Sequence, residues 1–160
     1  MLANFSLPRQ RGTMHGHVML YRAALHDETN TIPTWLQEAV SSYVSVLNDC
    51  AYSYANHWKN AAHLIEDADR AGEIETALQA REPEQAFKGA ELALMRYAEK
   101  LTLSPGDMVE AGVAALRDAG LDDGAILEAN QIICYFNYVN RSINGLGVTT
   151  AGDTVGYYAD

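Results

Sequence analysis

Apolar residues recur at every third or fourth position along most of this 160-residue chain. Such spacing places them on one face of a helix with 3.6 residues per turn, and the clearest example consists of Leu36, Val40, Val44 and Leu47. No segment alternates apolar and polar residues with the period of two that a half-buried strand requires. The sequence therefore predicts an all-α fold, a bundle of about six or seven helices.

Short polar breaks divide this pattern into elements. We expect helices near residues 17–26, 32–47, 50–66, 87–101, 109–116 and 122–143, and a short exposed helix near 73–79. Pro33 suits a first helical turn, Ser104 can cap the helix after it, and Asp122 can cap the last helix. Residues 1–160 are interpreted as a single domain, with residues 1–16 irregular. The tail, residues 149–160, is expected to be flexible or held against a neighbouring subunit.

The charge of the chain excludes several classes of partner. Its 11 Lys and Arg stand against 21 Asp and Glu, a net charge of −10, so phosphate backbones and anionic membranes are repelled and we expect no nucleic-acid or membrane partner. No apolar run reaches the ~20 residues of a membrane span, and the N-terminus has no signal-peptide pattern. Two cysteines are too few for a disulfide scaffold. These features predict a cytoplasmic, reducing setting.

The most informative stretch for chemistry runs from Gln37 to Trp58. Cys50, Ser53 and His57 lie three, four or seven residues apart, so a helix would align them in one stripe. Cys50 would stand in the first turn, where free backbone N–H groups and the helix dipole favour a thiolate. His57 could then accept a proton directly or through the Ser53 hydroxyl. Glu38, on the preceding helix, could reach the same pocket if the chain folds back.

These residues carry a resemblance to a known family. Glu38, Cys50 and His57 fall on the pattern Glu-(eleven residues)-Cys-x-x-Cys-x-x-x-His of alkylhydroperoxidase D-like (AhpD-like) enzymes, in the carboxymuconolactone decarboxylase family. The phrase LNDCAYS resembles that family's Asn-x-Cys-x-Tyr-Cys. The segments 99–129 and Tyr135–Val148 are similar to its peroxidase-related subgroup. The resemblance covers roughly residues 33–148 and implies an AhpD-like helical bundle.

The resemblance also implies an activity: an antioxidant oxidoreductase that reduces peroxides or exchanges with thiols. Its catalytic residues would be Cys50, His57, Glu38 and Ser53, with no cofactor and no metal, in a homo-oligomer (dimer, trimer or hexamer). The departure lies at Ser53, which occupies the position of the family's second cysteine. A serine cannot form a disulfide and is a poor nucleophile without activation. The resemblance therefore predicts a single-thiol, Cys-x-x-Ser site, with peroxide or a thiol as the small-molecule partner.

Two alternatives remain open at this point. A lyase acting on a small carboxylated lactone would need His57 and Glu38 but no thiol, with Arg141 as one candidate for the substrate's charge. A non-catalytic oligomeric protein would need none of these residues.

Other residues receive simpler interpretations. Cys134 lies in the apolar run IICYF and is expected in the core, although a disulfide with Cys50 is conceivable. His15 and His17 form a weak metal motif with no third ligand at a suitable spacing. Asn140 and Arg141 are expected to brace helix packing.

Overall fold

The computed structural model describes residues 11–158, and within them all regular secondary structure is helical. Seven α-helices and two 3-10 turns occur in this range: α1 (Arg11–Leu25), α2 (Thr34–Leu47), α3 (Ala51–Ile65), α4 (Ala68–Ala80), η2 (Pro83–Gln85), α5 (Gly89–Leu103), η3 (Pro105–Asp107), α6 (Glu110–Asp118) and α7 (Asp123–Gly145). The predicted all-α fold of six or seven helices is confirmed.

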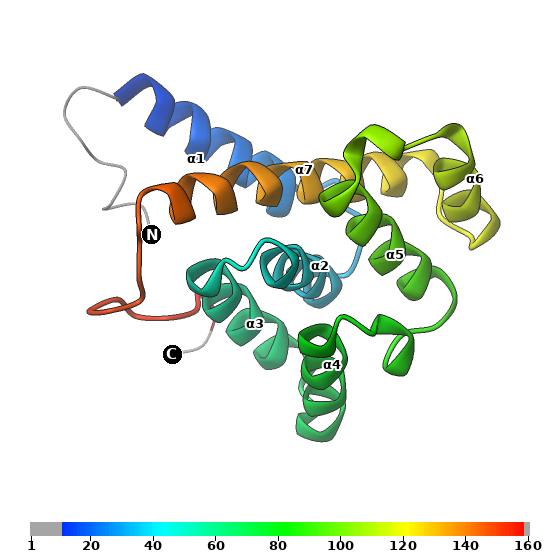
Figure 1. Ribbon diagram of the computed structural model, residues 1–160, viewed down its shortest axis with the longest axis horizontal. Helices are drawn as coiled ribbons and strands as arrows, with labels where there is room; N and C mark the ends of the chain where they lie inside the picture. The colour runs from blue at the N-terminus through cyan, green and yellow to red at the C-terminus, as the bar shows by residue number, and fades with distance from the viewer. Residues whose placement is uncertain (1–10, 159–160) are drawn as a thin grey trace.

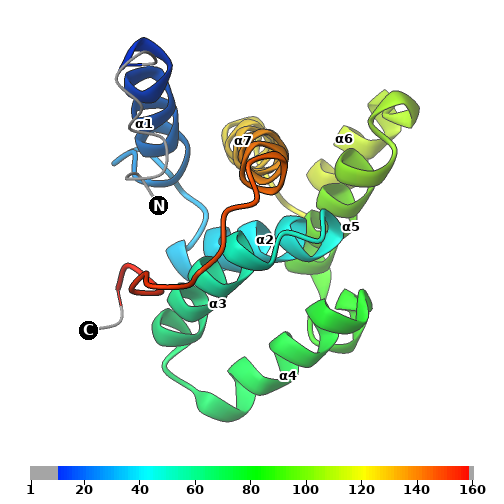
Figure 2. The same ribbon diagram turned by 60° about the vertical axis from the view of Figure 1, so that its left-hand side comes forward.

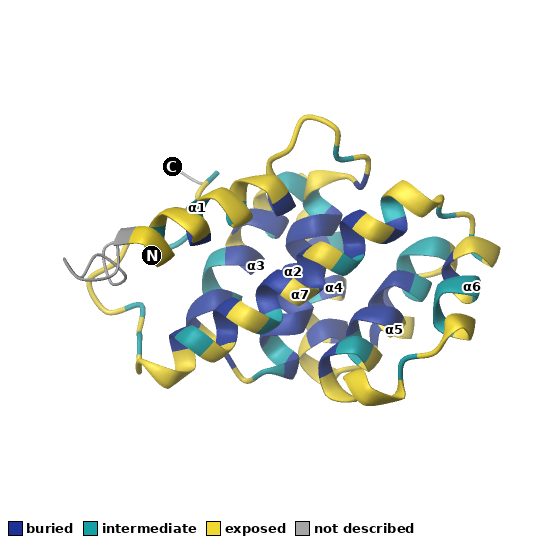
Figure 3. Cartoon of the chain, turned by 90° about the horizontal axis from the view of Figure 1, so that it is seen from above, coloured by how far each residue is buried: buried dark blue, intermediate teal, exposed yellow. Residues whose placement is uncertain are grey.

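Helix α2 is the centre of the bundle. It packs against α3, α4, α5 and α7, and Figures 1 and 2 both show it between α7 on one side and α4 on the other. Figure 3 shows buried residues concentrated along α2 and α7, whereas α1 and α6 are exposed over much of their length. None of the described helices is both long and apolar enough to cross a membrane.

Three serines lie buried on this central helix. Ser41, Ser42 and Ser45 each donate a hydrogen bond to the carbonyl oxygen four residues earlier, at 2.7, 2.8 and 2.7 Å. A buried hydroxyl is costly only if it lacks a partner, so these bonds let small polar side chains sit in the core. The surface of α2 facing α3 and α7 therefore provides hydroxyl groups as well as apolar atoms.

Several helix ends agree with the sequence, and two do not. Helix α3 begins at Ala51, directly after Cys50, and the Asp122 carboxylate caps α7 by accepting from Ala125 N–H at 2.8 Å. Ser104 caps nothing with its side chain, because η3 separates it from α6. Pro33 stands at the N-cap of α2, one position before the first turn in which we expected it.

Two further segments differ from expectation. Helix α1 begins at Arg11, so residues 11–16 are helical, whereas residues 1–10 lie outside the described range. Helix α4 is longer than residues 73–79 and is not simply exposed, since it buries Ala71, Ile74, Ala77 and Leu78. These residues are spaced as a helical face requires, but polar residues between them obscured the pattern.

The described part of the tail is held by its own chain. The Tyr52 hydroxyl donates to the Asp153 carboxylate at 2.8 Å, and the Asn56 side-chain oxygen accepts from the Gly156 N–H at 3.1 Å. Figure 2 shows the segment leaving α7 and running beside α3. Residues 149–158 therefore contact α3 of their own chain, and their contact with a neighbouring subunit stays a prediction.

Candidate active site

A buried hydrogen bond between a histidine and a carboxylate links helices α2 and α3. The Nδ1 atom of His57 lies 2.6 Å from Oε2 of Glu38, and the two residues are only 2% and 1% exposed. The fold-back of α2 against α3 therefore brings Glu38 to His57, as the sequence required for a shared site. When Nδ1–H donates to the carboxylate, the other ring nitrogen, Nε2, is left to accept a proton.

The pair has further partners that hold its geometry. The Asn60 amide donates to the second carboxylate oxygen of Glu38 at 3.3 Å. The imidazole of His57 meets the ring of Phe136 on α7 edge to face, with centroids 4.5 Å apart. A buried carboxylate is tolerated where hydrogen bonds satisfy its oxygens, so the Asn60 amide supports this arrangement.

Cys50 caps the start of α3 and is fully buried, at 0% exposure. Burial raises the pKa of its thiol above the ordinary value, and a hydrogen bond from the Ser53 backbone N–H lowers that pKa only in part. The helix start thus acts in the predicted direction, but desolvation outweighs it. The expected stabilisation of the thiolate is therefore outweighed, because burial favours the neutral thiol.

The Ser53 hydroxyl is held by α2. It lies 2.9 Å from the Ser45 hydroxyl, and the Asn140 amide of α7 donates to Ser45 at 3.2 Å. Ser45 has one proton, and its closest acceptor is the Ser41 carbonyl oxygen at 2.7 Å. Ser45 therefore accepts from Ser53, whose own oxygen retains lone pairs for one further donor.

The four predicted site residues thus form two adjacent groups. Glu38 and His57 are bonded to each other, whereas the Ser53 hydroxyl is bonded to Ser45. Within residues 11–158 no hydrogen bond joins the Cys50 sulfur or the Ser53 hydroxyl to His57. Cys50, Ser53 and His57 lie along one side of the helix as predicted, but hydrogen bonds do not connect them into a path for a proton.

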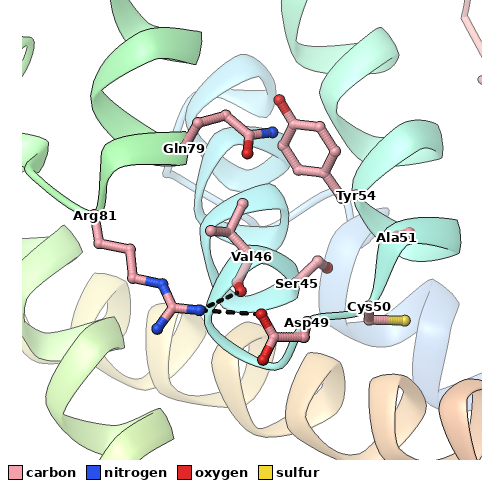
Figure 4. A pocket seen from close by; sticks show the side chains of 8 residues that line it. All are labelled: Ser45, Val46, Asp49, Cys50, Ala51, Tyr54, Gln79 and Arg81. Atoms are coloured by element: carbon pink, nitrogen blue, oxygen red, sulfur yellow. Dashed lines mark hydrogen bonds and ion pairs between the residues drawn. The ribbon is translucent and has the colours of Figure 1, made fainter.

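A cavity of about 390 Å³ opens at the start of α3. It is lined from the ends of α2 and α4 and from the first turn of α3, by Ser45, Val46, Asp49, Cys50, Ala51, Tyr54, Gln79 and Arg81. The Arg81 guanidinium donates to the Val46 carbonyl at 3.3 Å and to Asp49 at 3.1 Å. Figure 4 shows the Cys50 sulfur pointing away from Arg81.

Sequence reasoning missed several residues of this site. Asn60 follows His57 by three positions and so shares its helical face, a signal that was available. Ser45 and Asn140 come together only because α7 crosses α2. Arg81 reaches the cavity from the end of α4, where its backbone adopts a left-handed φ of 59°. No spacing in the sequence indicates that contact.

The second cysteine does not lie where we predicted it. Cys134 is exposed, because Ile132, Ile133 and Phe136 take the buried face of α7 and turn position 134 outwards. It lines a shallow groove between α1 and α7. Both cysteines are free thiols, so the conceivable disulfide between them is not formed.

The remaining residues singled out in the sequence make packing contacts and hydrogen bonds outside the Cys50 cavity. Asn140 braces α7 on α2 through Ser45, and Arg141 donates to Asn137 on its own helix at 2.7 Å. The ring of His17 packs against Tyr135 and Tyr138 of α7. Among the described residues no group of three His, Cys, Asp or Glu side chains could hold a metal ion.

Comparison with known proteins supports the fold. No family model matches the chain, and no curated protein matches it in sequence. An uncharacterized peroxidase-related protein from Silicibacter sp. TM1040 superposes with a TM-score of 0.76 at 19% identity, over 85% of this chain and 69% of that one. An AhpD-core peroxidase-related protein from Ralstonia eutropha JMP134 gives 0.77 at 18%, over 92% and 75%.

A debrominase shares the same architecture. A cysteine-to-alanine variant of the debrominase Bmp8, in complex with 2,3,4-tribromopyrrole, superposes with a TM-score of 0.73 at 17% identity, over 89% of this chain and 72% of that chain. Identities this low speak for the fold rather than for one reaction. The helical arrangement and these neighbours together show that the chain has the AhpD-like fold of the peroxidase-related proteins.

Proposed function

We propose that this protein is a single-thiol peroxidase-type oxidoreductase with Cys50 as its reactive group. The observation that carries the proposal is the position of Cys50. It lies at the start of α3, between a cavity of about 390 Å³ and a helical face that holds the buried Glu38–His57 pair. A thiol, a base and a space for a small substrate are the parts that such chemistry needs.

The reaction follows from the single thiol. The Cys50 thiol loses its proton, and the sulfur attacks one oxygen of a hydroperoxide. The O–O bond breaks, and the proton goes to the leaving oxygen, so a sulfenic acid and an alcohol form. A low-molecular-weight thiol then condenses with the sulfenic acid, releasing water and forming a mixed disulfide. A second such thiol releases Cys50 and leaves as the oxidised small-molecule disulfide.

The remaining residues support the proton transfers. Because burial raises the pKa of Cys50, the thiol needs a base at neutral pH, and Nε2 of His57 is the base that Glu38 orients. No hydrogen bond joins Cys50 to His57 among the described residues. The proton therefore reaches His57 through a substrate that lies between the two groups, or through the Ser53 hydroxyl after it has turned away from Ser45.

The decisive measurement is thiol-dependent consumption of an alkyl hydroperoxide. Cys50→Ala should abolish it, and Cys134→Ala is the matched control, which should retain the rate within about twofold because Cys134 lies outside the site. Mass spectrometry after peroxide treatment without reductant should find one added oxygen at Cys50. Unchanged turnover in Cys50→Ala would sink the proposal.

Two other outcomes would point to the alternatives. Turnover of a carboxylated lactone that depends on His57 and Glu38 but not on Cys50 would favour the lyase. A protein that folds normally and turns over neither substrate would favour a non-catalytic role.

We also propose that the chain forms a homo-oligomer. Support comes from large apolar side chains that α1 and α7 leave exposed, Met19, Leu20 and Tyr138. Such groups usually mark contact surfaces when they lie together. Light scattering coupled to gel filtration measures the assembled mass, and a monomer at all concentrations would contradict this.

A further inference from the structure

Asn60 stands between the Glu38–His57 pair and the tail of the chain. Its Nδ2 donates to Oε1 of Glu38 at 3.3 Å, and its Oδ1 accepts from the backbone N–H groups of Tyr157 at 2.6 Å and Tyr158 at 3.3 Å. Asn60 itself is only 2% exposed. We call residues 150–158 the C-terminal strap; Figures 1 and 2 show it passing beside α3.

The strap holds the oxygen end of the Asn60 amide. An asparagine side chain can rotate by half a turn and exchange its donor and acceptor ends. Two backbone N–H groups of the strap require an acceptor on their side, so the oxygen must face the strap and the NH₂ group must face Glu38. Without the strap, only the single 3.3 Å bond to Glu38 would orient this amide, and nothing would hold its oxygen in place.

Other contacts place the strap close to the same carboxylate. Burial and, next, the negative charge of Glu38 raise the pKa of Tyr158. The Tyr158 hydroxyl lies 3.4 Å from Nδ1 of His26, and the His26 ring lies 6.0 Å from that of Tyr157. Gly156 lies against α3 with a φ of +88°, where an added Cβ would lie 2.9 Å from the Lys59 side chain. The strap is thus fitted closely to α3 at the position of Asn60.

We infer that Asn60 is a positioning residue for the Glu38–His57 pair and that the C-terminal strap fixes it in its working orientation. The strap is then part of the site, although it follows the last helix and contributes no side chain to the Cys50 cavity. The structural half of this inference stands on the hydrogen bonds alone. Its consequence for turnover rests on the proposed peroxidase function.

The first test removes one hydrogen bond of the strap. Tyr157→Pro deletes the N–H that reaches Asn60 at 2.6 Å, and it also loses the exposed Tyr157 ring with its contacts to His26 and Tyr158. The matched control, Tyr157→Ala, loses the same ring and contacts but keeps the N–H. The readout is the low-field ring N–H proton of His57 in ¹⁵N-histidine-labelled protein, assigned by its absence in His57→Gln. We expect Tyr157→Pro to shift or broaden this signal and Tyr157→Ala to leave it in place.

The second test changes Asn60 itself. Asn60→Asp keeps an oxygen for the strap but replaces the donor to Glu38 with an acceptor. For alkyl hydroperoxide turnover we expect kcat to fall by about 10-fold to 100-fold, as for a misplaced catalytic group. KM should hardly change, because Asn60 does not line the cavity. The His57 signal should move as in Tyr157→Pro.

The outcomes separate the two ideas. An unchanged His57 signal in both Tyr157→Pro and Asn60→Asp would overturn the inference, whatever the activity. Equal effects of Tyr157→Pro and Tyr157→Ala would also overturn it, because the lost N–H would not be the cause. If the signal moves as expected but the wild-type protein consumes no peroxide, the positioning role stands and only the proposed function fails.

Discussion

The two cysteines of this chain have contrasting surroundings. Cys50 is fully buried at the start of α3, beside a cavity and near the buried Glu38–His57 pair. Cys134 is exposed in the middle of α7, and its nearest polar partner is the Asn130 side chain at 3.8 Å. The accessible thiol, Cys134, therefore lies away from the Glu38–His57 pair and the cavity. Cys50 lies beside both but is buried from bulky reagents.

This difference shows what a thiol site of this fold depends on. Burial raises the pKa of both thiols, so neither is activated simply by where it lies. What distinguishes Cys50 is a set of oriented polar groups contributed by α2, α3 and α7. Substitutions beside each thiol test whether those groups matter as much as their burial indicates.

The largest expected effect is on stability and comes from the Glu38–His57 hydrogen bond. Glu38→Ala leaves the buried Nδ1–H of His57 without its acceptor and should cost about 1.5–3 kcal/mol of unfolding free energy, as the loss of a hydrogen bond to a charged group does. The matched change beside the other thiol, Asn130→Ala, removes a bond to the Tyr97 hydroxyl and should cost only about 1 kcal/mol. Urea denaturation measures both. Similar losses would mean that the Cys50 surroundings have no special role.

Alkylation should separate the two thiols by accessibility. In the folded protein, N-ethylmaleimide should label Cys134 about 100-fold faster than Cys50, because the rate at a buried thiol is limited by local opening. Peptide mass spectrometry gives the two rates. In urea the rates should become similar, and in Cys134→Ala only the slow reaction should remain. Equal rates in the folded state would show that the Cys50 sulfur is open to large molecules.

A smaller effect is expected from the serine that stands in the second thiol position. Ser53→Ala removes the hydrogen bond to Ser45 and should lower stability by about 1 kcal/mol. Thr76→Ala is the control, since its hydroxyl makes an exposed bond within α4 to Gly72 and should matter little. Thermal unfolding of the two variants provides the comparison. If Ser53→Ala lost no more stability than Thr76→Ala, the bond to Ser45 would not anchor Ser53 on α2.

The smallest effect concerns alkaline pH. Folding raises the pKa of Cys50, so the unfolded chain loses this proton first as the pH rises. Stability from this group is complete below the unfolded value of about 8.5 and declines from there up through the raised folded value. Cys50→Ser should therefore flatten the fall in stability between neutral and alkaline pH. An unchanged slope would contradict the pKa direction.

Much of the fold could be predicted because helices are local structures. The spacing of apolar residues gave the helices on either side of Cys50, and the carboxylate of Asp122 marked the start of α7. The spacing of apolar residues mispredicted burial where polar residues interrupt a buried face or where apolar residues follow one another directly. Ala71, Ile74 and Leu78 form the buried face of α4 within a polar stretch, and position 134 points outwards within an apolar run. The successive apolar residues of that run cannot all face inwards, because each step along a helix turns the side chain by about 100°.

The sequence by itself determined the helices, the stripe of Cys50, Ser53 and His57, and the presence of Glu38 on the preceding helix, because these depend on spacing along one or two neighbouring elements. Tertiary structure alone decided which groups meet. It joined Ser45 to Asn140 across α2 and α7, and it placed the strap on Asn60, 97 residues away in the chain. It also raised the pKa of Cys50, since desolvation depends on everything packed around the thiol and not on its position in a helix.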